Sequence, residues 1–269
     1  MIENILFPVD FSAPCASIAP YVKRAAEMFG AQVALVHACD LMSNNGFELV
    51  GRNIWEVAED HRTVAEARLK SFLDSEFPHA ACPRILRFGE AAAEIAEVAS
   101  TGRFDLIVIP TRAGHFRRML LGSTAAKVLN NADCPVMTSQ HAETAVPRTL
   151  EHRVWVCAIG LSQDSERILR VASRAAATVG ASLSLIHATC DGAEADARRR
   201  LEGLLNTVRC EAQLCVTTGP VKQALLDAVR LSAADALIIG RTHRNKRWRR
   251  VRGLTEDLVR ESPFPVLIV

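Results

Sequence analysis

The 269-residue sequence lacks several features that would assign it directly to a class of proteins. No apolar run approaches the roughly 18–20 residues that a membrane-spanning helix needs. The N-terminal segment MIENILFPVD has no basic region followed by a long apolar stretch. We therefore expect no membrane span and no signal peptide. The net charge is only +2, so the total gives no indication of a dedicated nucleic-acid binder.

Redox and catalytic motifs are also missing. The eight cysteines are dispersed, mostly among apolar residues, and no Cys-x-x-Cys pair occurs. Such cysteines are more often reduced core residues than a disulfide framework, which predicts a cytoplasmic protein. The Gly-x4-Gly-Lys-Ser/Thr loop of ordinary NTPases and the Gly-x-Ser-x-Gly turn of hydrolases are both absent. An enzyme is accordingly the less favoured interpretation.

The chain does contain an internal repeat. At an offset of 150 residues, ILFPVDFS is matched by WVCAIGLS, and GAQVALVHACD by GASLSLIHATCD. At an offset of 130, GEAAAEI is matched by GPVKQAL, FDLIVIP by ADALIIG, and DCPVM by PFPVL. Two constant offsets over five pairs of segments indicate a tandem duplication, with a longer insert in the first half.

Strands and helices alternate in each half. The first half predicts buried strands at 5–9, 33–37, 85–88, 106–109 and 135–138, and helices at 12–29, 47–75, 91–100 and 123–130. This alternation predicts an α/β fold in which helices cover both faces of a parallel sheet. The predicted domains are 1–141 and 153–269, and the polar segment 142–152 joins them.

The segments ILFPVDFS, VALVHACD, FDLIVIPTR, LLGSTAAKVL and ADCPVM, in this order and spacing, resemble the universal stress protein family in two tandem copies. The resemblance implies a flavodoxin-like (Rossmann-like) sandwich with a five-stranded parallel sheet in each half, in a cytoplasmic stress-response protein. Single-copy members commonly dimerise through the fifth strand. The two halves are therefore expected to form an internal pseudo-dimer, in which PFPVLIV pairs with strand 135–138. A further homodimer stays open.

Some family members bind ATP and others lack the site. Their motif is Gly-x2-Gly-x9-Gly-Ser/Thr, together with an aspartate after the first strand whose carboxylate meets the adenine. The glycines let backbone N–H groups approach the phosphates, and the final pair places them at a helix N-terminus. Ligands of such folds bind at the carboxyl ends of the strands.

The first half keeps part of this motif. Asp10 matches the adenine aspartate, and Ala38 matches the backbone position after the histidine of the second strand. Gly122 and Ser123, followed by Thr124, match the phosphate-binding helix start. The resemblance therefore implies one weakened ATP site in this half.

The loop before that helix start departs from the motif. Pro110 replaces the first glycine, and Ala113 stands at the second position, with Gly114 displaced by one residue. Because proline removes a backbone donor, we expect cationic side chains of the loop to replace part of the lost contact. The candidates are Arg112, His115, Arg117 and Arg118; the alternative is that these are solvated loop charges.

The second half departs further from the motif. Gly160 stands where the aspartate is expected, and His243 occupies the second glycine position after Gly240. One register places Gly253 at the helix start, followed by Leu254, while the spacing of the first half places Arg252 there. Either register breaks the motif, so we expect this half to be structural.

The sequence contains two further kinds of cluster. The basic loop RNKRWRRVR (244–252) suits either nucleic acid or solvent, and we favour solvent because no matching basic stripe exists elsewhere. His37-x-Cys39 and His187-x2-Cys190 each offer only two metal ligands, fewer than zinc requires. We expect no bound metal, and instead a hydrogen-bonded histidine at each strand end.

Three functional hypotheses remain. The leading one is a nucleotide-responsive regulatory or binding module with ATP in the N-terminal half. The second is a structural or protein-interaction module with neither site occupied, which the damaged motifs in both halves favour. The third is a slow ATP hydrolase that depends on Asp10.

Overall fold

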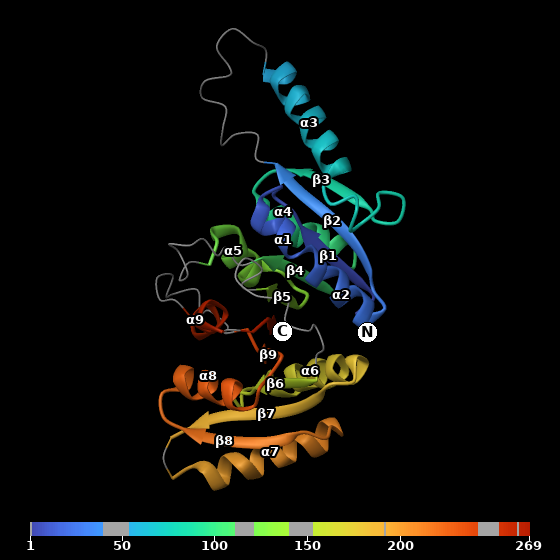
Figure 1. The fold of residues 1–269 in the computed structure, drawn as a ribbon. Coiled ribbons are helices and arrows are strands. Elements are labelled where there is room, and N and C mark those ends of the chain that lie inside the picture. Colours follow the sequence, from blue (N-terminus) through green and yellow to red (C-terminus); the bar gives the residue numbers. More distant parts are fainter. Residues whose placement is uncertain are drawn as a thin grey trace. The chain divides into compact units, whose positions relative to one another are not determined.

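The computed structural model describes residues 2–39, 54–110, 121–139, 153–190, 192–241, 253–262 and 264–269, and in them strands and helices alternate as predicted (Figure 1). The first half contains strands β1 (Asn4–Pro8), β2 (Gln32–Cys39), β3 (Arg84–Phe88), β4 (Leu106–Pro110) and β5 (Val136–Ser139). Its helices are α1 (Ala13–Ser17), α2 (Ala19–Phe29), α3 (Ile54–Ser71), α4 (Ala91–Thr101) and α5 (Ser123–Asn131).

The second half repeats this order. Its strands are β6 (Val154–Ala158), β7 (Ser182–Thr189), β8 (Gln213–Thr218), β9 (Ala236–Ile239) and β10 (Val266–Ile268). Its helices are α6 (Ser165–Val179), α7 (Glu194–Val208), α8 (Val221–Leu231) and α9 (Leu254–Glu261). The chain divides into two compact units: an N-terminal unit of Ile2–Pro110 and Gly122–Cys134, and a C-terminal unit built around Pro135–Val269.

The N-terminal unit contains four parallel strands in the order β3-β2-β1-β4. The apolar run of β1 is fully buried, because helices cover a parallel sheet on both faces. The expected single helix over 12–29 is divided into α1 and α2 at Ile18, since Pro20 in the first turn of α2 has no N–H for a continuous ladder. Ser12 caps the start of α1, and Gly30 ends α2 at φ 64°, as predicted.

The C-terminal unit contains six strands in the order β5-β10-β9-β6-β7-β8. Helices α7 and α8 lie on opposite faces of the β7–β8 part of its sheet (Figure 1). Five strands are parallel, whereas β5 pairs antiparallel with β10, matching Val266 with Thr138 and Ile268 with Val136. The predicted pairing of the last strand with strand 135–138 is therefore confirmed.

Candidate functional site

Three of the predicted ligand positions lie at one edge of the N-terminal sheet. Because β1 is parallel to both β2 and β4, the carboxyl ends of the three strands meet there. Asp10 follows β1 and is exposed, while Ala38 in β2 and Pro110 at the end of β4 are half-buried. The fold thus gathers residues that are about 28 and 100 positions apart in the sequence.

The Asp10 carboxylate is held in place by the turn that follows β1. Its Oδ1 accepts hydrogen bonds from the Ser12 backbone N–H at 3.0 Å and from the Ser12 hydroxyl at 2.5 Å. The same hydroxyl oxygen accepts a bond from the Cys15 N–H at 3.2 Å and so caps α1. One carboxylate oxygen is thereby fixed by two hydrogen bonds.

The phosphate-binding part of the motif lies at the start of α5. Gly122 is the N-cap residue, and no side chain in the described part of the chain caps the helix. Ser123 is exposed, and Gly122 and Thr124 are half-buried. The first N–H groups of α5 therefore form an anion-binding helix end in principle. The predicted contacts of Arg112 and Gly114, like the other cations of their loop, lie outside the described residues.

Each strand-end histidine is hydrogen-bonded to the backbone. His37 Nδ1 lies 2.7 Å from the Val9 carbonyl, and His187 Nδ1 lies 2.6 Å from the Ile159 carbonyl. A carbonyl only accepts, so each Nδ1 carries a proton. Burial lowers the pKa of His37 below its usual value. The predicted hydrogen-bonded histidine is confirmed, and the described residues contain no cluster of three metal-ligand side chains.

A pocket of about 520 Å³ lies between the carboxyl ends of β1 and β2 and helix α3. The sheet side contributes Phe11 and His37, whose ring centres are 4.2 Å apart. Helix α3 contributes Asp60, Val64 and Arg68, which lie on one face at intervals of one turn. This is a cavity that the sequence analysis did not anticipate, because neither side of it belongs to the ATP motif.

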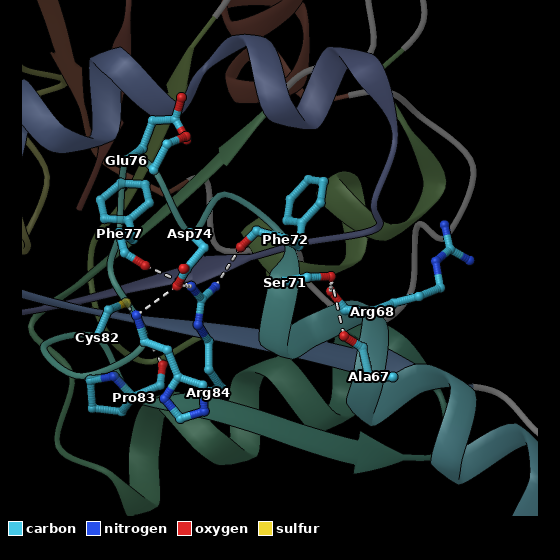
Figure 2. Close-up of polar contacts among 12 residues, drawn as sticks. Ala67, Arg68, Ser71, Phe72, Asp74, Glu76, Phe77, Cys82, Pro83 and Arg84 are labelled. Carbon is cyan, nitrogen blue, oxygen red and sulfur yellow. Dashed lines mark hydrogen bonds and ion pairs between the residues drawn. The ribbon is translucent and has the colours of Figure 1, made fainter.

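The end of α3 is fixed by Arg84 on β3, as Figure 2 shows. Its guanidinium donates to the Phe72 carbonyl at 2.7 Å and to the Phe77 carbonyl at 2.6 Å. It also lies 3.7 Å from the Asp74 carboxylate, and the Arg84 side chain is only 6% exposed. The ring of Phe72 in turn packs edge-on against Phe11 at 5.2 Å. Arg84 therefore sets where the α3 wall of the pocket stands.

The equivalent edge of the C-terminal unit has different side chains. Gly160 follows β6 where Asp10 follows β1. Gly253 is the N-cap residue of α9, and Leu254 is the first residue of the helix. Of the two registers that the sequence allowed, the one with Gly253 at the helix start is therefore correct. Thr255 in the first turn of α9 donates to the Gly240 carbonyl at 3.4 Å. Among the described residues, the position after β6 that corresponds to Asp10 therefore carries no carboxylate.

Gly240 has a packing reason of its own. A Cβ at this position would lie 2.3 Å from Ile168 Cδ1. The glycine that matches the first position of the motif thus makes room for α6. Its presence carries no information about phosphate binding.

Two further positions share a role that the sequence analysis missed. Asp105 Oδ2 accepts bonds from the N–H groups of Glu3 and Asn4 at 2.9 and 3.0 Å. Asp235 Oδ2 accepts bonds from the equivalent N–H groups of Arg153 and Val154 at the start of β6, at 2.6 and 2.8 Å. Each carboxylate ties the start of its central strand to the strand beside it. The repeat does contain the signal, because both aspartates stand at the same offset in FDLIVIP and ADALIIG.

The parallel sheets and their covering helices define a flavodoxin-like α/β protein. A model of the universal stress protein family matches residues 1–139. The chain belongs to the universal stress protein family, and it carries the fold in two tandem copies, as predicted.

The first half resembles whole single-copy proteins. It is 31% identical over 140 residues to a universal stress protein of Methanocaldococcus jannaschii, which covers 50% of this chain and 80% of the relative. It is 32% identical over 142 residues to one of Thermus aquaticus, covering 51% of this chain and 98% of the relative.

Both halves together resemble longer solved structures. A universal stress protein of Archaeoglobus fulgidus has a TM-score of 0.76 at 21% identity and covers 100% of this chain and 98% of its own. A functionally unknown protein of Pseudomonas aeruginosa has a TM-score of 0.67 at 16% identity, covering 100% and 92%. Among the described residues, no helix has both the length and the apolar character to cross a membrane.

Proposed function

We propose that this protein is a nucleotide-responsive regulatory or binding module of the cytoplasmic stress response, with ATP held by the N-terminal unit. The observation that carries the proposal is the Asp10 carboxylate, fixed through one oxygen by Ser12 at the carboxyl edge of the sheet. A carboxylate held in this way is preorganised to accept from the amino group of adenine, so little side-chain entropy is lost on binding.

The phosphate end of the site is supported by α5. An uncapped helix start favours anions, because its free N–H groups and the helix dipole both attract negative charge. Ser123 is exposed at this start, where its hydroxyl and N–H are accessible to a phosphate. The proposal therefore assigns adenine to Asp10 and Ala38, and a phosphate to Gly122, Ser123 and Thr124.

The test is the melting temperature of the full chain with and without millimolar ATP. A ligand at 100 times its Kd stabilises the folded state by about 2.7 kcal/mol, which corresponds to a rise of several degrees. We expect this rise for the natural sequence and its loss in Asp10→Ala and in Ser123→Ala. Asp196→Ala, which removes an exposed carboxylate on α7, is the matched control and should keep the rise.

The alternative is a structural or protein-interaction module with no nucleotide. Pro110 at the end of β4 and Gly160 after β6 favour it, since each removes a group that the ATP motif uses. No shift of the melting temperature at millimolar ATP would establish this alternative. Release of phosphate that disappears in Asp10→Asn would instead make the protein a slow ATP hydrolase.

A further inference from the structure

The turn after β1 depends on the backbone of Phe11. Its φ of 60° lies in the left-handed region, which residues with a side chain rarely adopt. Phe11 stands between Asp10 and Ser12, and the Ser12 N–H donates to the Asp10 carboxylate at 3.0 Å. Rotation of Phe11 to an ordinary negative φ would move this N–H relative to the Asp10 side chain. The position of the carboxylate therefore depends on the conformation of Phe11.

The ring of Phe11 is held by neighbours from other segments. The ring of His37 on β2 lies 4.2 Å from it, measured between ring centres. The ring of Phe72, which directly follows α3, packs edge-on at 5.2 Å. The Arg68 guanidinium of α3 lies 4.6 Å from the centre of the Phe11 ring. These contacts oppose rotation of the side chain and offset the cost of the left-handed backbone.

The neighbours of the ring are themselves fixed to the backbone. The Nδ1–H of His37 donates at 2.7 Å to the carbonyl of Val9, the residue before Asp10. The buried Arg84 guanidinium donates at 2.7 Å to the Phe72 carbonyl (Figure 2). The Phe11 ring thus lies between the edge of the sheet and the anchored end of α3. A series of printed contacts leads from Arg84 to the turn that carries Asp10.

The second half shows that the turn alone does not require an aromatic ring. Leu161 at the equivalent position is also left-handed, with φ 49°. Its carbonyl accepts a bond from Arg200 of α7 at 3.3 Å, and the residue before it is Gly160, which has no carboxylate. An aliphatic side chain is therefore compatible with this backbone. The packed aromatic ring occurs in the half whose turn holds a carboxylate in place.

From these contacts we infer that Phe11 is a positioning residue of the nucleotide site. Its packed ring holds the left-handed turn, and through this turn Ser12 holds the Asp10 carboxylate. The inference rests on the proposed function, because it gives Phe11 a role in adenine binding. Phe11 acts through Asp10 and needs no contact with the nucleotide. A carboxylate that had to be ordered on binding would weaken the affinity about three- to tenfold.

The first test needs no nucleotide. Exchange of the Ser12 amide proton with water, measured by NMR on the full chain, reports whether its bond to Asp10 is formed. We expect Phe11→Ala to speed this exchange at least about tenfold, because the N–H loses a charged acceptor. Phe11→Tyr, which keeps the ring, should leave the exchange rate unchanged. Phe11→Leu carries the side chain of the equivalent turn and should speed exchange at least about threefold, so it serves if Phe11→Ala does not fold.

The second test measures the Kd of ATP by calorimetry, at a temperature at which every variant is folded. Phe11→Ala should bind ATP about three- to tenfold more weakly than the natural sequence, and Phe11→Tyr should bind it equally well. Leu161→Ala is the matched control, since it truncates the left-handed residue of the other half. It should leave both the Kd and the Ser12 exchange rate unchanged.

The outcomes separate this inference from the proposed function. Unchanged Ser12 exchange in both Phe11→Ala and Phe11→Leu would overturn the inference. Faster exchange with an unchanged Kd would overturn it as well, because Asp10 would then bind adenine without being held. A natural sequence that binds no ATP would instead overturn the proposed function, and with it the role of Phe11 in adenine binding.

Discussion

The two halves of this protein share a backbone frame and differ in the side chains at the edge of each sheet. The histidine that ends the second strand of each half, His37 or His187, donates to the backbone at the end of the first strand. The third residue after the first strand of each half is left-handed, with φ 60° at Phe11 and 49° at Leu161. A non-glycine residue in this conformation is uncommon, so its occurrence at both positions reflects one inherited turn.

The side chains at equivalent positions of this shared backbone differ between the two halves. Asp10 stands before the left-handed residue in one half, and Gly160 stands there in the other. The third helix of the N-terminal unit places Arg68 over an aromatic ring, whereas Arg200 of α7 donates to the Leu161 carbonyl at 3.3 Å. The guanidinium therefore packs on an aromatic ring in the first unit and donates to the backbone in the second. The turn is thus preserved in both copies of the duplicated fold, while the side chains around it differ.

The largest expected effect on stability concerns β3 and β8, the third strands of the two halves. Arg84 and Leu214 occupy the same register position, opposite Leu35 and Leu185. We expect Arg84→Met to lower the free energy of unfolding by about 3 kcal/mol, because two half-buried carbonyls lose charged donors. Leu214→Met should cost less than about 1.5 kcal/mol. Urea unfolding measures both, and hydrogen exchange of the β2–β3 amides assigns the loss to the N-terminal unit. A cost below about 1 kcal/mol for Arg84→Met would contradict the conclusion that Arg84 fixes the end of α3.

A second prediction tests whether the shared frame is equally important in both halves. Asp105→Ala and Asp235→Ala each remove a carboxylate that accepts two backbone N–H bonds. We expect each variant to lose about 2 kcal/mol of stability, and the two losses to agree within about 1 kcal/mol. Denaturant titration of the two variants checks this. A clearly unequal pair would show that the two strand starts are not held in the same way.

A third prediction concerns pH and the N-terminal histidine. Burial lowers the pKa of His37, so the unfolded chain binds its proton more readily than the folded chain does. The contribution of His37 to stability is therefore present above its unfolded pKa of about 6.5 and is lost as pH falls through the lower folded pKa. NMR titration of the ring should show a midpoint below about 6.5, and His37→Gln should weaken the pH dependence of unfolding. A midpoint above that value would refute the burial argument.

The smallest expected effect on stability is that of Gly160→Asp, which would place a carboxylate where Asp10 stands in the first half. A Cβ at Gly160 meets no atom within 4 Å, so Gly160→Asp should change stability by no more than about 0.5 kcal/mol. Gly240→Ala should cost more, because its Cβ meets Ile168 at 2.3 Å and the side chain must move. Thermal unfolding of the two variants measures the contrast. A larger cost for Gly160→Asp than for Gly240→Ala would mean that Gly160 is required by the turn.

Much of the fold could be predicted because its signals are local or periodic. Buried strands read as apolar runs, Ser12 and Gly30 mark the ends of a helical segment, and the repeat offset identifies equivalent positions without any coordinates. The break at Ile18 was missed, although Pro20 gives a local reason for it. The register at Gly253 stayed open because it depends on where α9 begins, which two spacings in the sequence described equally well.

The sequence by itself determined the duplication, the family, the parallel α/β class and the position of Asp10 at a strand end, because each depends on residue pattern along the chain. Only the tertiary structure decided what surrounds that edge. Arg68, His37 and Phe11 come from three segments, and their spacing in the sequence follows no motif. Their meeting depends on how α3 packs against the sheet, which Arg84 fixes from a fourth segment. A pocket of this kind is a property of packing between distant elements, and no local pattern encodes it.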